Sequence, residues 1–463
     1  MLGSRKRNRF DAAFVTGAVL VASALTSGLS PARADDWLVR PEWVKAHEDF
    51  LASAPLQGRG SATRDEAIAA TYVASEFEAY GLKTAPGMAS YTQVGRIVRP
   101  HVAGTPSLTL AGGAPLTSLK LIIGAANIGG SFVLFDGSDP SRMPEAPIVV
   151  ITNPKTNLEQ LMGAAQAKQV KLLILAKSAA TDRLSQALGG RPAMRSYLEG
   201  STPPPSRSVV LASLTNEDIE TLTRSARRQL ALSAPIENDI VETTNAIGYL
   251  PGRDPNAGIL LVSAHLDHLG IVEGRIMPGA NDDASGTTAV LELAHALASG
   301  EPMRRGILFV CYGSEEIGGL GSRYFGDHPP VPLASIVANL ELEMIGSQDP
   351  RLPAGYLMMT GFERSDFGQI LKSKGALVTG DPYPEQHFFQ RSDNYSLALK
   401  GIVAHTVSGW AVVPTYHQPT DTIANLDIAF MTRAIQSLIA SLRFVANGQE
   451  TPHWRPGGRP AEK

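Results

Sequence analysis

Two adjacent carboxylates, Glu315 and Glu316, follow directly after the apolar run Ile307-Leu-Phe-Val-Cys-Tyr312. Like charges side by side at the end of a strand rarely serve packing, because a buried charge needs a partner. Further groups of His, Asp and Glu occur elsewhere in the chain: His265-Leu-Asp267, Asn281-Asp-Asp-Ala-Ser-Gly286, Glu341-Leu-Glu343 and Tyr416-His417-Gln-Pro-Thr-Asp421. Imidazoles and carboxylates are the ligands that zinc enzymes use. The pattern therefore predicts a metal centre.

One ligand from each group gives a set whose charge can be counted: His265, Asp282, Glu316, Glu343 and His417. Its three carboxylates and one bridging hydroxide balance the charge of two zinc ions. Asp282 can offer one oxygen to each ion, while His265 with Glu343 and His417 with Glu316 complete two open coordination spheres. This balance favours two ions over one.

Two further side chains complete the expected chemistry. Zinc lowers the pKa of bound water to about 7, which provides hydroxide at neutral pH. Glu315 lies beside a ligand and is not needed for charge balance, so we expect it to be the general base. Asp267 is positioned to accept the second N–H of the His265 ring and to fix its tautomer.

Apolar segments of strand length precede these groups, at 258–264, 307–312 and 334–340. Such runs are typical of buried parallel strands. Residues 286–298 carry apolar positions at helical spacing, and the alternation predicts an α/β fold with a mostly parallel sheet flanked by helices. Ligands of open α/β sheets bind beyond the carboxyl ends of the strands, so side chains distant in sequence are expected to meet there.

The ordered motifs resemble metallopeptidase family 28, the dizinc aminopeptidases, over roughly residues 240–425. They are His-x-Asp, Asn-Asp-Asp-Ala-Ser-Gly, Gly-Ser-Glu-Glu-x-Gly-Gly-Leu-Gly-Ser, Glu-x-Glu-Met-Ile-Gly, and Arg-Ser-Asp followed by Tyr-His-Gln-Pro-Thr-Asp-Thr. The resemblance implies a zinc aminopeptidase-like fold and the same five ligands, with Asp282 as the bridge and Glu315 as the base. It also implies that Tyr416 helps to polarise the substrate carbonyl. Glu343 stands where many members have aspartate, which puts the exopeptidase preference in doubt but not the metal site.

The roles of several other polar residues near the motifs stay open. Glu341 competes with Glu343 as a ligand, since strand alternation points both to one face; motif position favours Glu343. Asp283 and Asp393 are either anchors of the site or simple caps. A structural role is preferred for four histidines, although two of them could line the site: His268, His295, His387 and His405.

Between about Pro100 and Ile236 these motifs stop, and strand-like and helical segments alternate. The segment resembles a protease-associated domain inserted in the peptidase domain. We therefore expect five parts: a signal peptide at 1–34, the amino-terminal part of the peptidase domain at 35–99, the insert at 100–236, the catalytic domain at 237–447 and a disordered tail at 448–463.

Composition and the leader indicate where the protein acts. Basic residues precede an apolar stretch from Ala12 to Leu29, and Ala32-Arg-Ala34 is a cleavage pattern, so the leader predicts export to the periplasm or the extracellular space. No stable membrane insertion is expected after its removal. The net charge of −3 gives no indication of nucleic-acid binding, and the single cysteine, Cys311, excludes an intramolecular disulfide.

The sequence thus predicts an exported dizinc peptidase, an aminopeptidase acting on peptides with a free amino terminus. One alternative is a glutaminyl-cyclase-like transferase with a single zinc. The other is a binding module that keeps the peptidase fold without its chemistry. Zinc content of two, one or none per chain separates the three.

Overall fold

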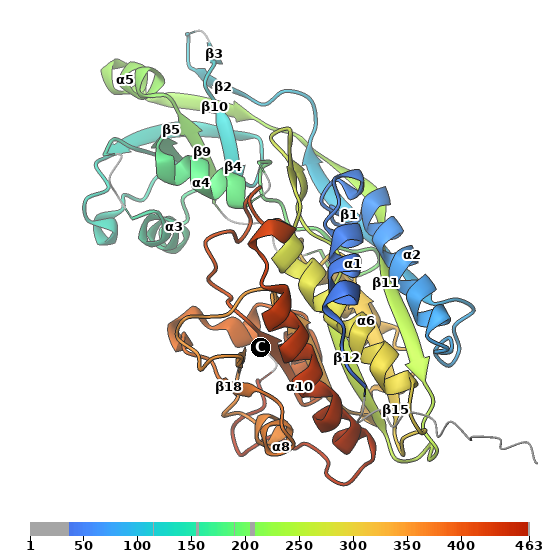
Figure 1. Cartoon of the computed structure of the whole chain (residues 1–463). Coiled ribbons are helices and arrows are strands. Elements are labelled where there is room, and N and C mark those ends of the chain that lie inside the picture. The colour runs from blue at the N-terminus through green and yellow to red at the C-terminus, as the bar shows by residue number, and fades with distance from the viewer. Residues whose placement is uncertain (1–36, 114, 154–156, 189, 204–208, 462–463) are drawn as a thin grey trace, which may run out of the picture.

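The structure, a computed structural model, describes residues 37–113, 115–153, 157–188, 190–203 and 209–461. The expected signal peptide lies outside the described residues. Two lobes are visible, a larger one built around a nine-stranded sheet and a smaller one built around an eight-stranded sheet (Figure 1).

The large sheet is mixed, with parallel strands at its centre. Its strands in spatial order are β18 (Val378–Gly380), β17 (Leu357–Met359), β19 (Ala404–Ser408), β16 (Ile336–Glu343), β12 (Ile259–His265), β15 (Gly306–Tyr312), β11 (Ile236–Leu250), β1 (Thr92–Val102) and β8 (Tyr197–Leu198). The four central strands β19, β16, β12 and β15 run parallel, and β11 and β1 continue the sheet antiparallel. The prediction of a mostly parallel sheet is confirmed.

Helices cover both faces of this sheet, which explains why its central strands are apolar at every position. Along β15, Ile307, Phe309 and Cys311 pack into one hydrophobic cluster. The alternate residues Leu308, Val310 and Tyr312 pack into the other. The first face is covered by α1 (Pro41–Leu51), α2 (Arg64–Ala79), α6 (Ser285–Ala298), α8 (Phe367–Ser373) and α10 (Ile428–Ala446). The second is covered by α7 (Leu320–Asp327) and α9 (Asn394–Leu399).

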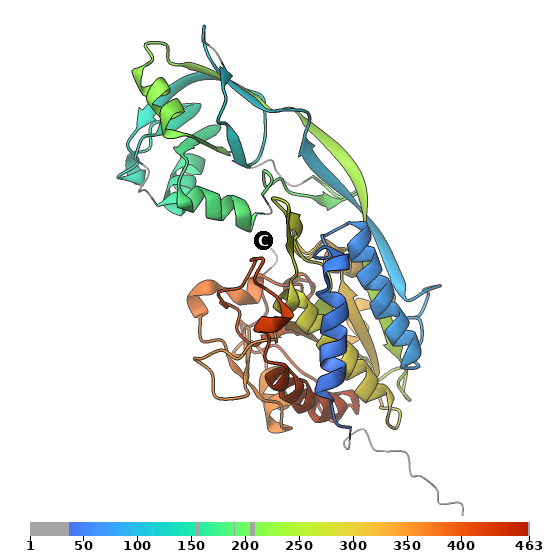
Figure 2. The same ribbon diagram turned by 45° about the horizontal axis from the view of Figure 1, so that its top comes forward.

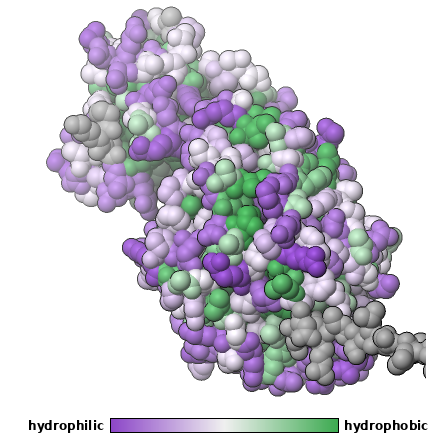
Figure 3. Space-filling view, in the orientation of Figure 1, coloured by the Kyte–Doolittle hydropathy of each residue, from purple (hydrophilic) through white to green (hydrophobic). Residues whose placement is uncertain are grey.

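The helix α10 is long and apolar enough to cross a membrane by length and composition, and half of that stretch is buried in the protein. Its apolar side chains, such as Phe430, Ile435 and Leu442, belong to the core of the large lobe. Hydrophilic and apolar residues are interspersed over this face of the molecule (Figure 3). We therefore describe α10 as a core helix.

The small lobe is an inserted α/β domain, as expected. Its sheet has the order β3 (Pro115–Leu116), β2 (Ser107–Leu110), β10 (Gln229–Ser233), β5 (Ile128–Phe135), β6 (Ile148–Ile151), β7 (Leu172–Ala176), β9 (Val210–Leu214) and β4 (Lys120–Ile123). Its helices are α3 (Leu158–Ala167), α4 (Ala179–Ala187) and α5 (Asn216–Arg224). Helices α3 and α5 pack on opposite faces of the sheet. The likeness to a protease-associated domain stays a prediction.

The two lobes are joined by the long strands β1 and β11 (Figure 2). These strands pair from Thr92 opposite Ala246 to Val102 opposite Ile236, and the Ala103 N–H donates to the Pro235 carbonyl oxygen at 2.8 Å. The chain therefore leaves the large lobe and returns to it at neighbouring points, which allows an insertion without disturbing the catalytic fold.

The expectation of a disordered tail is wrong for the described residues 448–461. The indole N–H of Trp454 donates to the Gly401 carbonyl oxygen at 3.0 Å, and its ring lies 5.2 Å from that of His405. The His453 N–H donates to Asp366 Oδ1 at 2.7 Å. The Pro, Gly and Arg content suggested disorder, but one aromatic anchor and these backbone contacts hold the segment on the large lobe.

Candidate metal centre

The expected site residues converge at the carboxyl ends of the central strands. His265 is the last residue of β12, Glu343 is the last residue of β16, and Glu315 and Glu316 follow shortly after β15. Asp282 lies in the turn η4 (Ala280–Ala284) that leads into α6, and His417 lies in the loop after β19. The parallel strands thus bring together side chains that are up to 152 positions apart.

These side chains form two groups that share Asp282: His265, Asp282 and Glu343 in one, and His268, Asp282, Glu316 and His417 in the other. Within each group the candidate ligand atoms all lie within 4.8 Å of one another. Asp282 Oδ1 is 3.3 Å from His265 Nε2, and Asp282 Oδ2 is 3.2 Å from His417 Nε2. The two oxygens of one carboxylate therefore face the two groups, as a bridging ligand requires.

The donor atoms of the site fit a pair of metal ions. Several of them are buried and have no hydrogen-bond partner within the described chain: His265 Nε2, His417 Nε2, Asp282 Oδ2 and Glu316 Oε1. Buried polar atoms are almost always satisfied, so such a convergence needs an explanation. Imidazole nitrogens and carboxylate oxygens facing shared points are the donor set of zinc. The ligand roles themselves stay predictions.

The carboxylate of Asp267 holds the segment that carries the two glutamates. Its Oδ1 accepts the Glu315 N–H at 2.9 Å, and its Oδ2 accepts the Glu316 N–H at 3.3 Å. The Ser61 hydroxyl donates to the same Oδ2 at 2.5 Å. His265 Nδ1 lies nearer to the Asp267 backbone oxygen, at 3.2 Å, than to Oδ1, at 3.7 Å. We therefore revise the expected contact: the backbone oxygen faces the ring, because the carboxylate is engaged by the glutamate backbone.

The loop with Asp282 is held from both sides. Asp421 accepts the N–H groups of Asn281 and Asp282 at 2.9 and 3.1 Å. Asp283 Oδ1 accepts the N–H groups of Gly286 and Met344, both at 2.9 Å. Asp283 is thus an anchor that ties the start of α6 to the end of β16. Asp421 belongs to the last sequence motif, which assigned it no role. Its position four residues after His417 was the one indication that it lies near the site.

The buried side chain of Arg59 supports the same loops by hydrogen bonds to their backbone. Its guanidinium donates to the carbonyl oxygens of Leu266, at 2.9 Å, and of Pro278 and Gly279, both at 2.8 Å. These carbonyls precede Asp267 on one side and the Asp282 turn on the other. A single cation therefore holds together the two segments that carry ligands.

The structure separates the two glutamates at the end of β16. Glu341 is fully buried and accepts a hydrogen bond from the Ser263 hydroxyl. Glu343 belongs to the group with His265 and Asp282. Alternation places both side chains on the same face, but only Glu343 lies far enough along the strand to reach the metal centre.

The adjacent Glu315 and Glu316 differ in their protonation. Burial opposes ionisation of Glu316, but the nearby His417 outweighs it and lowers the pKa of Glu316 to about 2. For Glu315, burial dominates and raises the pKa well above its ordinary value. Neighbouring groups whose pKa values are driven apart are typical of acid–base sites. Glu316 thus stays an anionic donor, while Glu315 can take up a proton.

Tyr416 lies beside the centre. Its ring stacks on that of His417 with centroids 3.9 Å apart, and it lines a small cavity of about 30 Å³ together with Glu343. Burial raises the pKa of Tyr416 well above its ordinary value, so the phenol stays protonated and can donate a hydrogen bond. The position is compatible with the role expected for it, which stays a prediction.

His268 is the ligand-type residue that sequence analysis missed. We preferred a structural role for it, yet its Nδ1 lies 2.7 Å from Glu316 Oε1 and 3.7 Å from Asp282 Oδ2. His405 and His295 do lie elsewhere: His405 bonds to Ser365 and to the Thr360 carbonyl, and His295 stacks on Tyr80. In the sequence, the one indication that His268 belongs to the site was its place three residues after His265.

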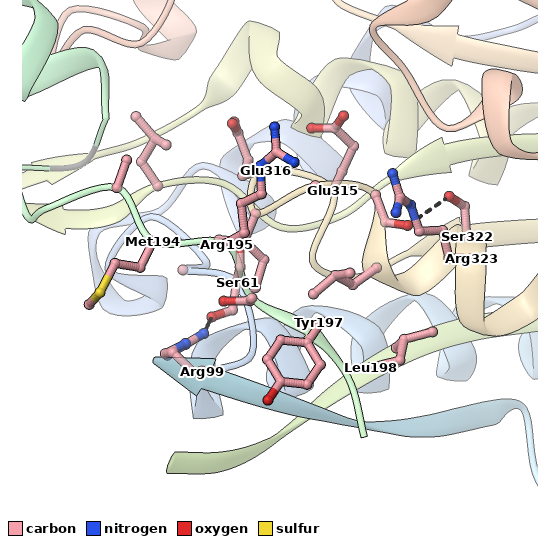
Figure 4. Close-up of a pocket in the computed structure, with 18 of the residues that line it drawn as sticks. Ser61, Arg99, Met194, Arg195, Tyr197, Leu198, Glu315, Glu316, Ser322 and Arg323 are labelled. Atoms are coloured by element: carbon pink, nitrogen blue, oxygen red, sulfur yellow. Dashed lines mark hydrogen bonds between the residues drawn. The ribbon is translucent and has the colours of Figure 1, made fainter. Parts of the chain in front are cut away.

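A large cavity opens above the metal centre. It measures about 1700 Å³, and its wall includes Glu315, Glu316, His268 and His417 of the large lobe as well as residues 191–198 of the insert segment. In Figure 4, the side chain of Arg195 reaches toward Glu315 and Glu316, while Arg99 and Tyr197 lie farther from the two glutamates in this view. The centre is therefore open to a ligand of peptide size.

A buried imidazole and carboxylate cluster at the carboxyl edge of a doubly covered α/β sheet is the arrangement of a metal-dependent enzyme. Residues 245–442 match the model of peptidase family M28. This part of the chain therefore belongs to peptidase family M28, as its motifs predicted.

Relatives support the same assignment. The chain is 33% identical to the aminopeptidase YwaD of Bacillus subtilis over 259 residues, which cover 53% of each protein. It is 30% identical to an aminopeptidase of Pseudomonas aeruginosa over 257 residues, covering 55% of this chain and 44% of that protein. The matched part thus spans about half the length of these relatives.

A solved structure confirms the fold over a longer range. A zinc aminopeptidase from Bacillus subtilis superimposes with a TM-score of 0.59 and covers 88% of this chain and 95% of that one. The sequence identity is 19%, so this likeness concerns the fold.

Proposed function

We propose that the chain is a zinc-dependent aminopeptidase that removes residues from the amino terminus of peptides. The observation that carries this proposal is the sharing of Asp282 by two groups of ligand atoms, with Glu315 beside them and outside both groups. Membership of peptidase family M28 and the aminopeptidase relatives support it.

The residues have the following roles in this proposal. His265, Asp282 and Glu343 would hold one zinc ion, and Asp282, Glu316 and His417 would hold the second. When bound, the ions would supply a Lewis acid for the peptide carbonyl and lower the pKa of a water molecule. As general base, Glu315 would accept a proton from the attacking water and deliver it to the amine of the leaving peptide. Asp267 keeps Glu315 and Glu316 in place through their backbone N–H groups.

The shapes of the two cavities support removal of residues from one end. The small cavity beside Glu343 and Tyr416 holds about 30 Å³, which is too little for a peptide chain. The large cavity, which Glu315 and Glu316 line, holds about 1700 Å³. We infer that the peptide extends into the large cavity and that its amino terminus lies near Glu343 and Tyr416.

Zinc content and terminal selectivity test this function together. We expect about two zinc ions per chain by elemental analysis, loss of activity with a chelator and recovery with zinc. Leucine p-nitroanilide should be hydrolysed, while its N-acetyl form should not, because it lacks the free amine. Equal rates on both would contradict an aminopeptidase and favour an endopeptidase.

The other two hypotheses give different results. One zinc per chain with cyclisation of N-terminal glutamine would indicate the glutaminyl-cyclase-like transferase. No bound metal and no turnover would indicate a binding module. The six ligand-type side chains of the site, together with Glu315, favour the hydrolase.

Export of the mature protein is the remaining part of the proposal. It rests on the basic and apolar leader and its cleavage pattern after Ala34. Appearance of the protein in the periplasm or medium, starting near Asp35, would test it by N-terminal sequencing. Retention of the full leader on a membrane would contradict it.

A further inference from the structure

The strap, which we define as residues 191–198, spans the large cavity and is held at both ends. At the insert end, the Ala193 N–H donates to the Ile122 carbonyl oxygen at 2.9 Å, and the Gly124 N–H donates to the Ala193 carbonyl oxygen at 3.0 Å. At the other end, Leu198 pairs with Ile97 of β1 in the large sheet. The side chains of the strap therefore have a defined place opposite the metal centre.

The next residue reinforces this attachment. The Glu199 N–H donates to the Arg96 carbonyl oxygen at 2.8 Å, and the two side chains form an ion pair at 2.7 Å. Backbone bonds to both lobes fix the strap, so it is part of the cavity wall and not a free loop.

The cavity wall is rich in arginines that have no carboxylate partner among the described residues. Five arginines line it, two from the strap and three from the large lobe: Arg191, Arg195, Arg99, Arg323 and Arg391. Within the described part of the chain, none of the five has a carboxylate at ion-pair distance. The wall's sixth cation, Lys400, is neutralised by Asp327 at 2.8 Å.

The anionic groups of the wall do not balance these arginines. Glu315, Glu316 and Asp393 line the part of the cavity at the metal centre, where metal ions would offset their charge. Beyond the centre, Asp65 is the one described wall carboxylate without a basic partner. Burial lowers the pKa of Arg99, the nearby Glu66 opposes this shift, and Arg191 adds to it because the two positive charges, which line the same cavity, repel each other.

Such a wall recognises a particular chemistry. Clefts lined by one sign of charge concentrate the field and attract the opposite charge. The planar guanidinium group binds carboxylates through two parallel hydrogen bonds. A carboxylate placed between the strap and the large lobe would relieve the repulsion between Arg99 and Arg191 and gain a bond from Arg195.

We propose that Arg195, with Arg191 and Arg99, forms a subsite for a carboxylate on the leaving-group side of the scissile bond. In Figure 4, Arg195 extends from the strap toward Glu315 and Glu316, while Arg99 lies beside Ser61, farther from the two glutamates in this view. The substrate class is therefore acidic or short peptides, in which a side-chain carboxylate or the free carboxyl terminus follows the scissile bond closely. This inference rests on the aminopeptidase function proposed above.

Matched substrates distinguish the two sources of the carboxylate. Leu-Gly-Gly is compared with its carboxyl-terminal amide, and Leu-Glu-Gly-amide with Leu-Gln-Gly-amide. We expect kcat/KM to be about 10-fold higher for at least one carboxylate member, since a charge-assisted hydrogen bond is lost in its neutral partner. The pair that shows the preference identifies the source. A preference in neither pair overturns the proposal.

Variants connect the preference to the arginines. Arg195→Gln and the double variant Arg191→Gln/Arg195→Gln should bring the ratio toward one, mainly through KM, while Arg195→Lys retains part of it. Arg183→Gln removes an arginine of the same insert that does not line the cavity, and it should leave the ratio unchanged. An unchanged ratio in the double variant, with zinc content and circular dichroism like the parent, overturns the assignment.

A binding measurement separates this subsite from the proposed reaction. In the zinc-loaded Glu315→Gln variant, calorimetry should show tighter binding of the preferred carboxylate peptide than of its neutral partner. If leucine p-nitroanilide and all peptides resist hydrolysis by the parent protein, the aminopeptidase function fails. Equal affinities of Glu315→Gln for the two peptides of each pair would reject the subsite, whatever the outcome for activity.

Discussion

The imidazole Nδ1 of His268 lies 2.7 Å from the Oε1 atom of Glu316, while Oε2 of that carboxylate faces His417 Nε2 at 3.1 Å. His268 is fully buried, and its backbone N–H donates to the Arg59 carbonyl oxygen at 2.9 Å. The ring thus either orients Glu316 or shares its ion. Both roles connect His268 to metal affinity.

We expect His268→Ala to weaken the binding of one of two zinc ions by about 10- to 100-fold, as loss of a partner of a metal ligand does. Competition with a chromogenic chelator measures both affinities without any reference to activity. His295→Ala, which alters a histidine stacked on Tyr80, serves as the control. Two unchanged zinc affinities in His268→Ala would remove the residue from the metal centre.

Glu315→Gln should keep both zinc ions and lower kcat by about 100-fold or more, because the general base is lost. Asp65→Asn removes another carboxylate of the same cavity wall and should stay within a few-fold of the parent. A parent-like kcat in a zinc-loaded Glu315→Gln protein would exclude the role.

The pH profile gives a second measurement on Glu315. Burial raises its pKa, and the base must be deprotonated to act, so kcat/KM should rise with pH through that pKa. The acidic limb should be absent from the residual activity of Glu315→Gln. Persistence of the same limb would assign it to another group.

Asp282→Asn should reduce zinc content and activity together, because this carboxylate faces both groups of ligands. Asp283→Asn should retain more zinc but unfold more easily, by about 1 to 3 kcal/mol, since its oxygens accept the N–H groups of Gly286 and Met344. Metal analysis and denaturant unfolding of both proteins check the pair. The reverse order of zinc loss would move the bridging role to Asp283.

Replacing residues 103–235 by a short Gly/Ser turn should leave zinc binding largely intact. The ends to be joined are adjacent, because Val102 pairs with Ile236 in the large sheet. The variant loses the strap and one side of the cavity, so the rates on long peptides should rise relative to those on leucine p-nitroanilide. Unchanged length preference in a folded, zinc-loaded variant would show that the insert serves another purpose, such as docking to a partner.

Local patterns sufficed for much of this protein. Apolar runs identified β12, β15 and β16, and the helical spacing after Ser285 identified α6, because burial on both faces of a sheet requires such residues. The order of the motifs indicated family M28, and the chemistry of zinc indicated which side chains to group. These properties are encoded within short segments and need no knowledge of long-range contacts.

Tertiary structure alone decided how the segments meet. His268 and Asp421 lie in or next to the motifs, but only the convergence of strand ends brings them to Glu316 and to the Asp282 turn. The pairing of Leu198 with Ile97 similarly turns Arg195 into a wall residue of the metal-centre cavity. A strand follows from its local pattern, but its pairing partner depends on the packing of distant segments. For that reason the sequence by itself left the roles of these residues open.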